Sequence, residues 1–309
     1  MNPILVTGAS GFIGGNLVRD LALQKLEVVG ICHPTDRVEQ SGMTRIDLRN
    51  AGEVNKLFRQ HKFSAVFHVA APGVSAESEN LTHLIEVNKL GTALLGRAAL
   101  LNGVERFVYV GSGFEYQPQA TPVSESTPLG GPNLYGASKT AGWMLLDSLC
   151  RLQGLPLVTF RPFSIYGPGE RPSKLIPYVI LQTLLREPTR LTLATQVRDY
   201  LFVDDLIEAL RLELAAPHAI GQVYNIGSGP EQGMSVRALV KKILVLMGAS
   251  VTLCWFDRAN RNRNEPPFLV SDPTKAHVEL GWHPRVHLAE GLGRTLEWYE
   301  ARIPKEVSA

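Results

Sequence analysis

A tyrosine and a lysine four residues apart are the clearest candidates for chemistry in this sequence. Tyr135 and Lys139 lie in the run YGASK at the start of a predicted helix, where a spacing of four places both side chains on one face. An ammonium group beside a phenol would lower the pKa of the phenol, so that the phenolate becomes accessible near neutral pH. Ser112 follows a strand-like run at 107–110 and would lie where parallel strands open towards a ligand. The three residues together suit proton exchange with a hydroxyl group.

A glycine-rich loop follows the first strand-like run and opens the first predicted helix. It reads TGASGFIGG from residue 7, with glycines recurring at intervals of three. Such a loop provides the tight turn and the close backbone approach that a pyrophosphate needs, and the helix N-terminus offers free N–H groups. The sequence therefore predicts a dinucleotide site formed by Gly8, Ser10, Gly11, Phe12, Ile13 and Gly14.

The end of the second strand distinguishes between two forms of a nicotinamide cofactor. An acidic residue there would bind the ribose hydroxyls of NAD, but Cys32 occupies that place, with His33 beside it and Arg37 within reach. A missing carboxylate removes repulsion against a 2′-phosphate, and a nearby cation could hold one. We therefore expect NADP as the preferred cofactor. The alternative is that Asp36 reaches back to the ribose and the cofactor is NAD.

The elements that would position these residues alternate regularly in the first half of the chain. Apolar runs at 4–6, 28–31, 65–69, 107–110 and 157–160 alternate with helical stretches at 14–26, 51–61, 81–102 and 135–153. Strands that are apolar throughout predict a parallel sheet covered on both faces, an α/β fold of the Rossmann, doubly wound type. After Arg161 the elements become less regular, with helices at 176–185 and 235–247 and a strand at 223–226. We expect a dinucleotide-binding domain over 1–165 and a smaller mixed α/β substrate domain over 166–309, with segments that cross back.

Length and charge exclude several classes of protein. The 309 residues correspond to about two domains, and 45% hydrophobic against 19% charged residues is too apolar for disorder. A net charge of +2 argues against nucleic acid or a membrane surface as a partner, because both need concentrated positive charge. No apolar run reaches the ~20 residues that span a bilayer, and three cysteines fit neither a disulfide framework nor a zinc site. We expect a cytoplasmic protein without a signal peptide and without a metal.

Taken together, the motifs resemble those of the extended short-chain dehydrogenases/reductases, in the group of nucleotide-sugar epimerases, dehydratases and 4-ketoreductases. The resemblance covers nearly the whole chain. Beyond the residues above, it rests on HVAA at 68–71, VNKLGT at 87–92, GSGFEY at 111–116, RPF at 161–163, YGPG at 166–169, RDY at 198–200 and LGW at 280–282.

This resemblance implies catalytic roles and binding partners. Hydride would pass between a nicotinamide and a sugar carbon, usually C4, while Tyr135 exchanges the hydroxyl proton, Ser112 shares the hydrogen bond and Lys139 holds the cofactor ribose. Further cofactor contacts implied are Asp47, Leu48, Val69, Ala70, Ala71, Asn88, Arg161 and Phe163. A nucleotide-diphosphate sugar would occupy the C-terminal domain, contacted by Phe114, Ser164, Arg198 and either Arg261 or Arg263. The resemblance also implies a homodimer formed through the helix that begins at Tyr135 and the helix before it.

Departures from the family pattern narrow the reaction. The 4,6-dehydratases place proton-transferring acids after the catalytic Ser or Thr, where this chain has Gly113 and Phe114. Epimerases that invert a carbon next to a ketone often need a Cys and a His, and no Cys stands in the GSGFEY or RPFS motifs. A 4-ketoreductase and a 4-epimerase remain.

Three features favour a 4-ketoreductase acting on a 4-keto-6-deoxy sugar nucleotide. The acid at the end of the second strand is missing, Ser164 replaces the Asn common in the epimerases, and GSGFEY with YGASKTAGWML resembles the reductases. Phe114 could pack against a C6 methyl group or belong to the core. The alternative is an NAD-dependent 4-epimerase of the UDP-glucose/galactose type. A non-catalytic NAD(P)-binding regulator is a more remote alternative, because such proteins lack part of the Ser, Tyr and Lys set. Nothing in the sequence identifies the nucleotide base.

Overall fold

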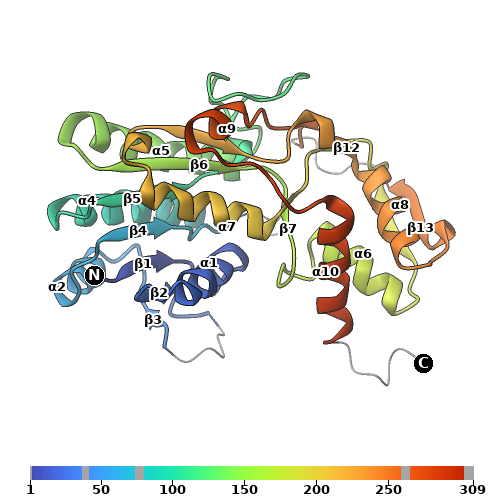
Figure 1. Ribbon diagram of the computed structural model, residues 1–309, viewed down its shortest axis with the longest axis horizontal. Helices are drawn as coiled ribbons and strands as arrows, with labels where there is room; N and C mark the ends of the chain where they lie inside the picture. The colour runs from blue at the N-terminus through green and yellow to red at the C-terminus, as the bar shows by residue number, and fades with distance from the viewer. Residues whose placement is uncertain (1, 37–41, 74–79, 259–264, 303–309) are drawn as a thin grey trace.

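A seven-stranded sheet forms the centre of the larger lobe (Figure 1). The computed structural model describes residues 2–36, 42–73, 80–258 and 265–302. The strand order is β11-β6-β5-β4-β1-β2-β3, and every neighbouring pair is parallel. The strands are β1 (Ile4–Thr7), β2 (Val28–Cys32), β3 (Thr44–Arg45), β4 (Ala65–His68), β5 (Arg106–Val110), β6 (Leu157–Pro162) and β11 (Val223–Ile226). The order reverses between β1 and β4, so the predicted Rossmann-type, doubly wound sheet is confirmed.

Helices cover both faces of this sheet because successive strand residues point to opposite sides. Leu5 and Val6 in β1 are both fully buried, and each belongs to a different apolar cluster. The cluster on the side of Val6 contains residues of α1 (Phe12–Leu23) and α7 (Val203–Leu212). The cluster on the side of Leu5 contains residues of α2 (Ala51–Gln60), α4 (Thr92–Leu101) and α5 (Leu134–Gln153).

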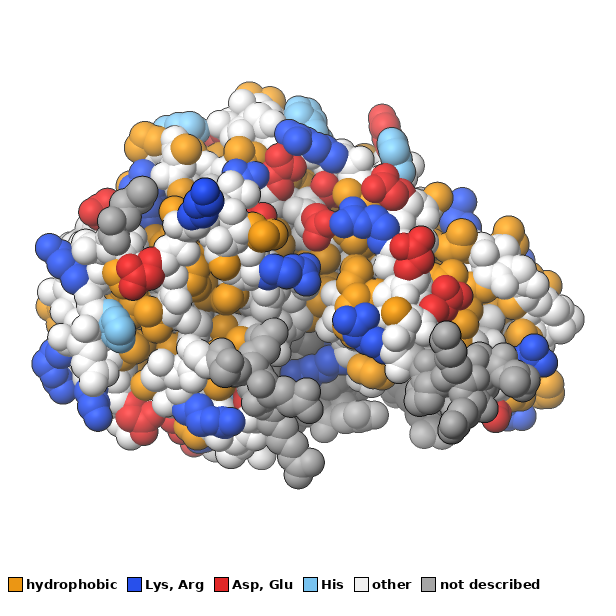
Figure 2. Space-filling model, turned by 60° about the horizontal axis from the view of Figure 1, so that its bottom comes forward, with side chains coloured by type: hydrophobic (Ala, Val, Ile, Leu, Met, Phe, Trp, Pro, Cys, Tyr) orange, Lys and Arg blue, Asp and Glu red, His pale blue; other side chains and the backbone are white. Residues whose placement is uncertain are grey.

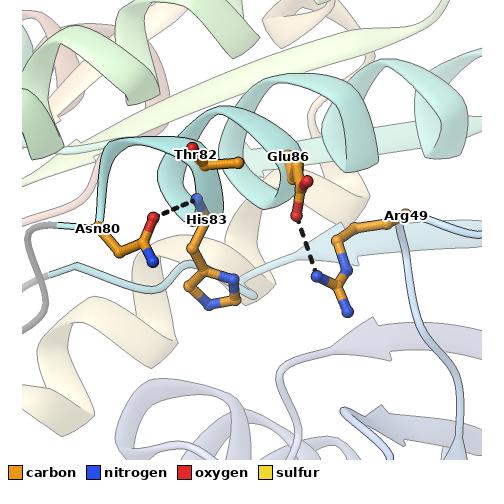
Figure 3. Close-up of a pocket in the computed structure, with 5 residues that line it drawn as sticks. All are labelled: Arg49, Asn80, Thr82, His83 and Glu86. Carbon is orange, nitrogen blue, oxygen red and sulfur yellow. Dashed lines mark hydrogen bonds and ion pairs between the residues drawn. The ribbon is translucent and has the colours of Figure 1, made fainter.

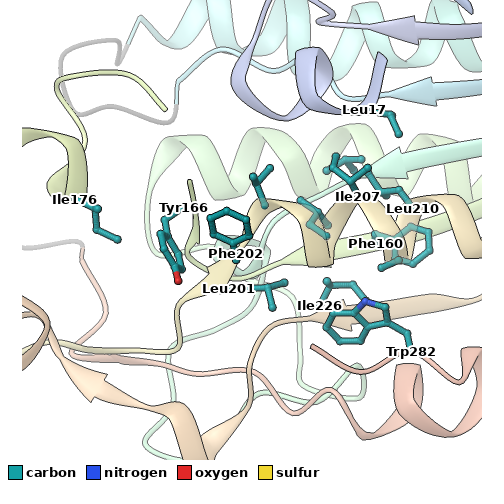
Figure 4. Packing of buried hydrophobic residues seen from close by; sticks show 14 of the residues in the cluster. Leu17, Phe160, Tyr166, Ile176, Leu201, Phe202, Ile207, Leu210, Ile226 and Trp282 are labelled. Carbon is teal, nitrogen blue, oxygen red and sulfur yellow. The ribbon is translucent and has the colours of Figure 1, made fainter. Parts of the chain in front are cut away.

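A smaller mixed lobe lies beside the sheet, at the right of Figure 1. Its helices are α6 (Leu175–Leu184), α8 (Val236–Leu246) and α10 (Leu288–Glu300), whereas α9 (Thr274–Leu280) contacts β11 of the central sheet. Short strands join them: β7 (Ile165–Tyr166), β8 (Thr189–Thr192), β9 (Val197–Arg198), β10 (Leu201–Phe202), β12 (Met234–Ser235), β13 (Cys254–Arg258) and β14 (Phe268–Leu269). Buried residues of the two lobes form one continuous cluster, which runs from Leu17 and Phe160 to Tyr166 and Ile176 (Figure 4).

The chain crosses back into the larger lobe after residue 166. Helix α7 packs on α1, and β11 adds the last strand of the sheet beside β6. Trp282 connects the segment after α9 to α7, because its buried ring donates a hydrogen bond from Nε1 to the Asp205 carbonyl at 2.9 Å. The division into 1–165 and 166–309 stays a prediction, with α7 and β11 as the segments that cross.

One helix differs from its sequence prediction. The stretch expected at 81–102 consists of α3 (Leu81–Leu84), a π-helical stretch (Ile85–Gly91) and α4. Helix α5 packs tightly here: a Cβ at Gly142 would lie 2.1 Å from the carbonyl oxygen of Asn88. The π-helical stretch therefore shapes the surface against which the helix carrying Tyr135 and Lys139 is held. Such stretches frequently occur at functional sites.

Candidate active site

The predicted site residues meet at one edge of the sheet, because most of them follow the carboxyl end of a strand. The predicted loop residues 8–14 follow β1, His33 follows β2, Asp47 and Leu48 follow β3, residues 69–71 follow β4, Ser112 follows β5 and Phe163 follows β6. In parallel sheets this edge, at the point where the strand order reverses, is where ligands bind.

The glycine loop has the close packing that a dinucleotide site requires. Gly8 has a φ of +67°, and a Cβ there would approach the Ala70 Cα to 2.8 Å. A Cβ at Gly14 would lie 2.1 Å from the Gly8 carbonyl oxygen. Phe12 and Ile13 then begin α1, whose N-cap, Gly11, has no side chain to cover the first N–H groups. These residues fit a pyrophosphate held by backbone N–H groups.

A buried polar network fixes the segment after β4 against this loop. The fully buried His68 bonds to Thr7 Oγ1 through Nδ1 and to Thr92 Oγ1 through Nε2, each at 2.8 Å. Burial lowers the pKa of His68 to about 3, so the ring is neutral. Thr7 Oγ1 also accepts from the backbone N–H groups of Val69 and Ala70. Residues 69–71 are thus held against the glycine loop.

Ser112, Tyr135 and Lys139 come together between β5 and α5. Ser112 begins a one-turn helix (Gly113–Glu115), and its side chain shares a hydrogen bond with Tyr135. Asn133 caps α5 by accepting from the Gly136 N–H, which sets where the helix begins. Lys139 is buried, and its Nζ donates to the Val110 carbonyl at 2.8 Å and lies 4.2 Å from the centre of the Tyr109 ring.

The ionisation of this trio differs from the sequence prediction. The pKa of Tyr135 is raised well above its ordinary value, because burial and the charge of Glu115 outweigh the hydrogen bond from Ser112. The prediction that Lys139 lowers this pKa was wrong for the structure described here: burial lowers the pKa of Lys139 itself to about 8, and its ammonium group bonds to a backbone carbonyl. Tyr135 is therefore held as a neutral phenol, able to donate a proton.

A buried ion pair lies directly beneath Ser112. Glu115 accepts from the Ser112 backbone N–H at 2.9 Å and from Arg161 Nε at 2.8 Å, and both charged side chains are at most 2% exposed. Arg161 also donates to the Tyr116 hydroxyl at 2.9 Å, and that hydroxyl donates to Asn225 of β11 at 2.7 Å. Arg161, predicted to contact the cofactor, is instead paired with Glu115, a residue that was not predicted to belong to the site.

Asn88 ties the catalytic helix to the segment after β4. Its Nδ2 donates to Ser138 Oγ at 2.9 Å and to the Pro72 carbonyl at 3.2 Å. Its buried Oδ1 has no hydrogen-bond partner among the described residues. An orphaned acceptor at this edge fits a donor supplied by a bound cofactor.

A cavity of about 350 Å³ lies beside the predicted cofactor residue Asp47 and is lined by Arg49, Asn80, Thr82, His83 and Glu86 (Figure 3). Arg49 spans it, donating to the Asp47 carboxylate at 2.7 Å and to Glu86 at 3.0 Å. This pairing lowers the pKa of Asp47 to about 2. Asn80 caps the helix on the far side by accepting from the His83 N–H. Arg49 was not among the residues predicted from the sequence, although it directly follows Asp47 and Leu48.

A second cavity, of about 390 Å³, lies in the smaller lobe and contains the predicted diphosphate residue Arg198. Arg198 is buried and pairs with Glu265 at 3.0 Å, and the buried hydroxyl of Tyr200 beside it has no hydrogen-bond partner among the described residues. Arg190 also lines the cavity. The molecular surface is hollowed between the two lobes, with Lys and Arg side chains visible there (Figure 2). Two arginines and an unpaired hydroxyl suit an anionic ligand.

The residues expected at the sugar have distinct surroundings. The Phe114 ring lies edge-on to Tyr135, with ring centres 6.5 Å apart. A Cβ at Gly113 would approach the buried ring of Phe163 to 2.8 Å. Ser164 has a φ of +38°, a conformation in which Asn is enriched, so the usual Asn at this place has a backbone reason.

Three predicted residues, Arg37, Arg261 and Arg263, lie outside the described residues. Within the described part of the chain, no three His, Cys, Asp or Glu side chains gather to hold a metal ion. No helix in that part is long and apolar enough to cross a membrane.

The chain is similar to known proteins in both sequence and structure. The model of the NAD dependent epimerase/dehydratase family matches residues 4–227. A UDP-glucose 4-epimerase of Mycolicibacterium smegmatis is 31% identical, over 96% of this chain and 97% of that protein. The crystal structure of UDP-glucose 4-epimerase from Thermotoga maritima with UDP-glucose has a TM-score of 0.89 and 26% identity, covering 98% of this chain and 100% of that one. The structure of DesIV, a dTDP-glucose 4,6-dehydratase of Streptomyces venezuelae with NAD bound, has a TM-score of 0.88 and 29% identity, covering 97% of each chain.

Proposed function

The chain belongs to the NAD dependent epimerase/dehydratase family, and from this premise we propose that it reduces the 4-ketone of a nucleotide-linked 4-keto-6-deoxy sugar. Ser112, Tyr135 and Lys139 are the catalytic residues in this proposal, and the ligand of the smaller lobe is a nucleotide-diphosphate sugar. Relatives named for UDP- and dTDP-glucose support that substrate class. The cavity with Arg190 and Arg198 supports it independently, because guanidinium groups bind diphosphates well.

The surroundings of Gly113 and Phe114 favour reduction of a 6-deoxy sugar over removal of water. Removal of water requires a proton-transferring side chain, and a glycine and a phenylalanine stand where dehydratases have such acids. Gly113 has no room for a side chain unless Phe163 moves. The apolar ring of Phe114 lies against Tyr135, which favours a sugar with a methyl group at C6 over one with a hydroxyl.

The protonation of Tyr135 agrees with reduction. A bound nicotinamide would supply the hydride, and the developing alkoxide at C4 needs a proton. Tyr135 is a neutral phenol with a raised pKa, and Ser112 shares its hydrogen bond, so the two can orient the ketone oxygen and donate the proton. Lys139 supplies a buried positive charge behind this pair.

We expect kcat/KM to fall as the pH rises through about 8. The pKa of Lys139 is lowered by burial, so the ammonium form predominates below this value and is lost above it. In Lys139→Arg the guanidinium keeps its charge, and the fall should disappear even if the maximal rate is lower. Rates measured from pH 6 to 10, with unfolding followed at each pH, test this. A flat wild-type profile through pH 9 would contradict it.

A 4-epimerase is the second candidate, for two observations. The relatives include UDP-glucose 4-epimerases. In addition, an acid of this chain, Asp36, meets the glycine loop, which suits the NAD that a 4-epimerase retains between its two hydride transfers.

Two assays separate the reactions. The protein is incubated with a 4-keto-6-deoxy sugar nucleotide, in UDP, dTDP, GDP and CDP forms, and loss of reduced cofactor is followed by absorbance. In parallel it is incubated with UDP-glucose and UDP-galactose without added reductant. Stoichiometric consumption of reduced cofactor supports the reductase. Interconversion of the two UDP-sugars, with no consumption of reduced cofactor on any keto sugar, assigns the epimerase instead.

A homodimer through α4 and α5 is part of the proposal. In these two helices, Ala98 and Leu146 lie in the core, and Leu145 is 40% exposed. Helix α5 also leaves Met144 57% and Leu152 78% exposed. Apolar side chains exposed together on one helix are suited to packing against a second copy of the chain.

Met144→Lys should convert a dimer into a monomer, because a charge would be buried without a partner in the contact. Light scattering after gel filtration should give twice 33.9 kDa for the wild type and 33.9 kDa for the variant. Val278→Lys, on the exposed face of α9, is the control and should stay dimeric. A monomeric wild type would overturn this contact.

A further inference from the structure

The carboxylate of Glu115 lies against the backbone of Ser112. The Ser112 N–H donates to Glu115 Oε1 at 2.9 Å, and Glu115 is fully buried. Gly111 makes room for this contact, because a Cβ there would lie 2.3 Å from the same oxygen. The Ser112 hydroxyl in turn accepts from the Phe114 N–H at 3.2 Å, so side chains close the one-turn helix from both ends. The hydrogen bond to Glu115 therefore fixes where the backbone of Ser112 lies.

The second oxygen of this carboxylate is anchored to the central sheet. Glu115 Oε2 accepts from Arg161 Nε of β6 at 2.8 Å. The Arg161 guanidinium lies 4.7 Å from the centre of the Trp143 ring of α5 and 4.7 Å from the centre of the Tyr116 ring. The Tyr116 hydroxyl, which accepts from Arg161, donates to Asn225 of β11 at 2.7 Å. The carboxylate is thus a fixed point tied to β6, α5 and β11.

The position of Ser112 matters because its hydroxyl group reaches Tyr135, with which it shares a hydrogen bond. The first turn of α5, which carries Tyr135, packs directly on the one-turn helix: a Cβ at Gly136 would lie 2.0 Å from the Phe114 carbonyl oxygen. Since this packing leaves α5 no room to follow, a displacement of Ser112 would change its hydrogen bond with Tyr135.

A buried ion pair at this place calls for a role other than stability. Replacing such a pair by apolar side chains of similar volume often leaves a fold as stable as before, or more stable. We propose that Glu115 is a positioning residue: by accepting from the Ser112 N–H, it holds the Ser112 hydroxyl where that group and Tyr135 together bind the ketone oxygen. The inference rests on the proposed function for the roles of Ser112 and Tyr135.

Two double variants of the full chain separate the hydrogen bond from the charge. Both replace Arg161 by Met, so that neither leaves a buried charge unpaired. In Glu115→Gln/Arg161→Met the amide oxygen can still accept from the Ser112 N–H, whereas Glu115→Leu/Arg161→Met offers no acceptor. Burial and, after it, the Glu115 charge raise the pKa of Tyr135. Both variants lack that charge, so its influence on Tyr135 is the same in the two.

We expect kcat on the keto sugar nucleotide to be about 100-fold lower in the Leu/Met variant than in the Gln/Met variant, the cost of displacing a reacting group by about 1 Å. KM should agree within a few-fold, and so should the affinities for NADH and NADPH in calorimetric titration, because only the hold on Ser112 differs. Hydrogen exchange followed by mass spectrometry should be faster over residues 111–116 in the Leu/Met variant. Thermal unfolding shows that each variant is folded at the assay temperature.

A third substitution separates positioning from a general loss of structure. When Ser112→Ala is added to each double variant, the hydroxyl that Glu115 holds in place is gone, and the two kcat values should become nearly equal. A purely structural effect would lower kcat equally with or without this hydroxyl. Equal kcat in the two double variants, or a ratio that stays near 100-fold after Ser112→Ala, would overturn the proposal.

The proposed reaction can fail separately from this inference. If the wild type interconverts UDP-sugars and reduces no keto sugar, the same ratio is expected in that assay, since the roles of Ser112 and Tyr135 are common to both reactions. A wild type that turns over neither kind of sugar removes the proposed function. Exchange over residues 111–116 then decides whether Glu115 holds Ser112, and equal exchange in the two double variants would show that it does not.

Discussion

Tyr135→Phe is expected to lower kcat by roughly 10²- to 10⁴-fold, the contribution typical of a positioned proton donor. The substitution removes one hydroxyl group, and with it the proton that neutralises the alkoxide at C4 and the hydrogen bond shared with Ser112. Since the ring remains edge-on to Phe114, KM for the sugar nucleotide should stay near the wild-type value. Steady-state rates with saturating reduced cofactor measure both constants.

A second tyrosine provides the matched control. Tyr224 in β11 is fully buried and donates its hydroxyl hydrogen bond to Glu279 at 2.9 Å, not to a member of the catalytic trio. Tyr224→Phe should keep kcat within a few-fold of the wild type. If Tyr135→Phe retained most of the wild-type kcat, Tyr135 would not be the proton donor, and the mechanism proposed for this site would be wrong.

Glu115→Gln is expected to destabilise the fold by about 3–5 kcal/mol, because it leaves Arg161 charged and buried without its partner. Arg161 already has one buried nitrogen, Nη2, with no hydrogen-bond partner among the described residues. The loss of Glu115 would therefore leave its guanidinium group still less satisfied. For a chain of 309 residues the loss corresponds to a fall in Tm of roughly 5–8 °C. Thermal and urea unfolding measure it.

The pair can be tested as a unit. Replacing both partners in Glu115→Leu/Arg161→Met removes both buried charges, and should recover much of the stability lost in the single variant. The exposed pair of Asp147 and Arg151 is the control: Asp147→Asn should change stability by less than about 1 kcal/mol. A double variant as unstable as Glu115→Gln, or a single variant as stable as the wild type, would show that the ion pair does not matter in this way.

The larger lobe could be predicted from the sequence because its strands are buried on both faces. Such strands consist of continuous apolar runs, and β1, β4, β5 and β6 all fall within two residues of the predicted bounds. The smaller lobe could not be predicted equally well. Its strands β7, β9, β10, β12 and β14 are two residues long, and they exist only through pairing with distant partners such as Phe268 with Val197.

The catalytic trio was recognisable because its members share short motifs. The groups around it were not, since they depend on side chains far apart in the sequence. Glu115 and Arg161 are separated by 46 residues, and either charge alone is indistinguishable from a surface residue. The raised pKa of Tyr135 was missed for a related reason: the i, i+4 spacing places Lys139 on the same face, but burial decides the ionisation of both groups.

Because the chain is synthesised from its N-terminus, β11 is made long after the other six strands of the central sheet. The sheet is complete only when residues 223–226 reach the edge of β6, and one of its faces is covered only in part, by α1, until α7 has been made. A nascent chain of 165 residues would therefore hold most of the strands while exposing an open sheet edge and part of an apolar face. Contacts between residues 157–162 and 223–226 also close a loop of about sixty residues, which slows folding. During synthesis this protein should thus depend on protection by chaperones until almost three quarters of it has been made.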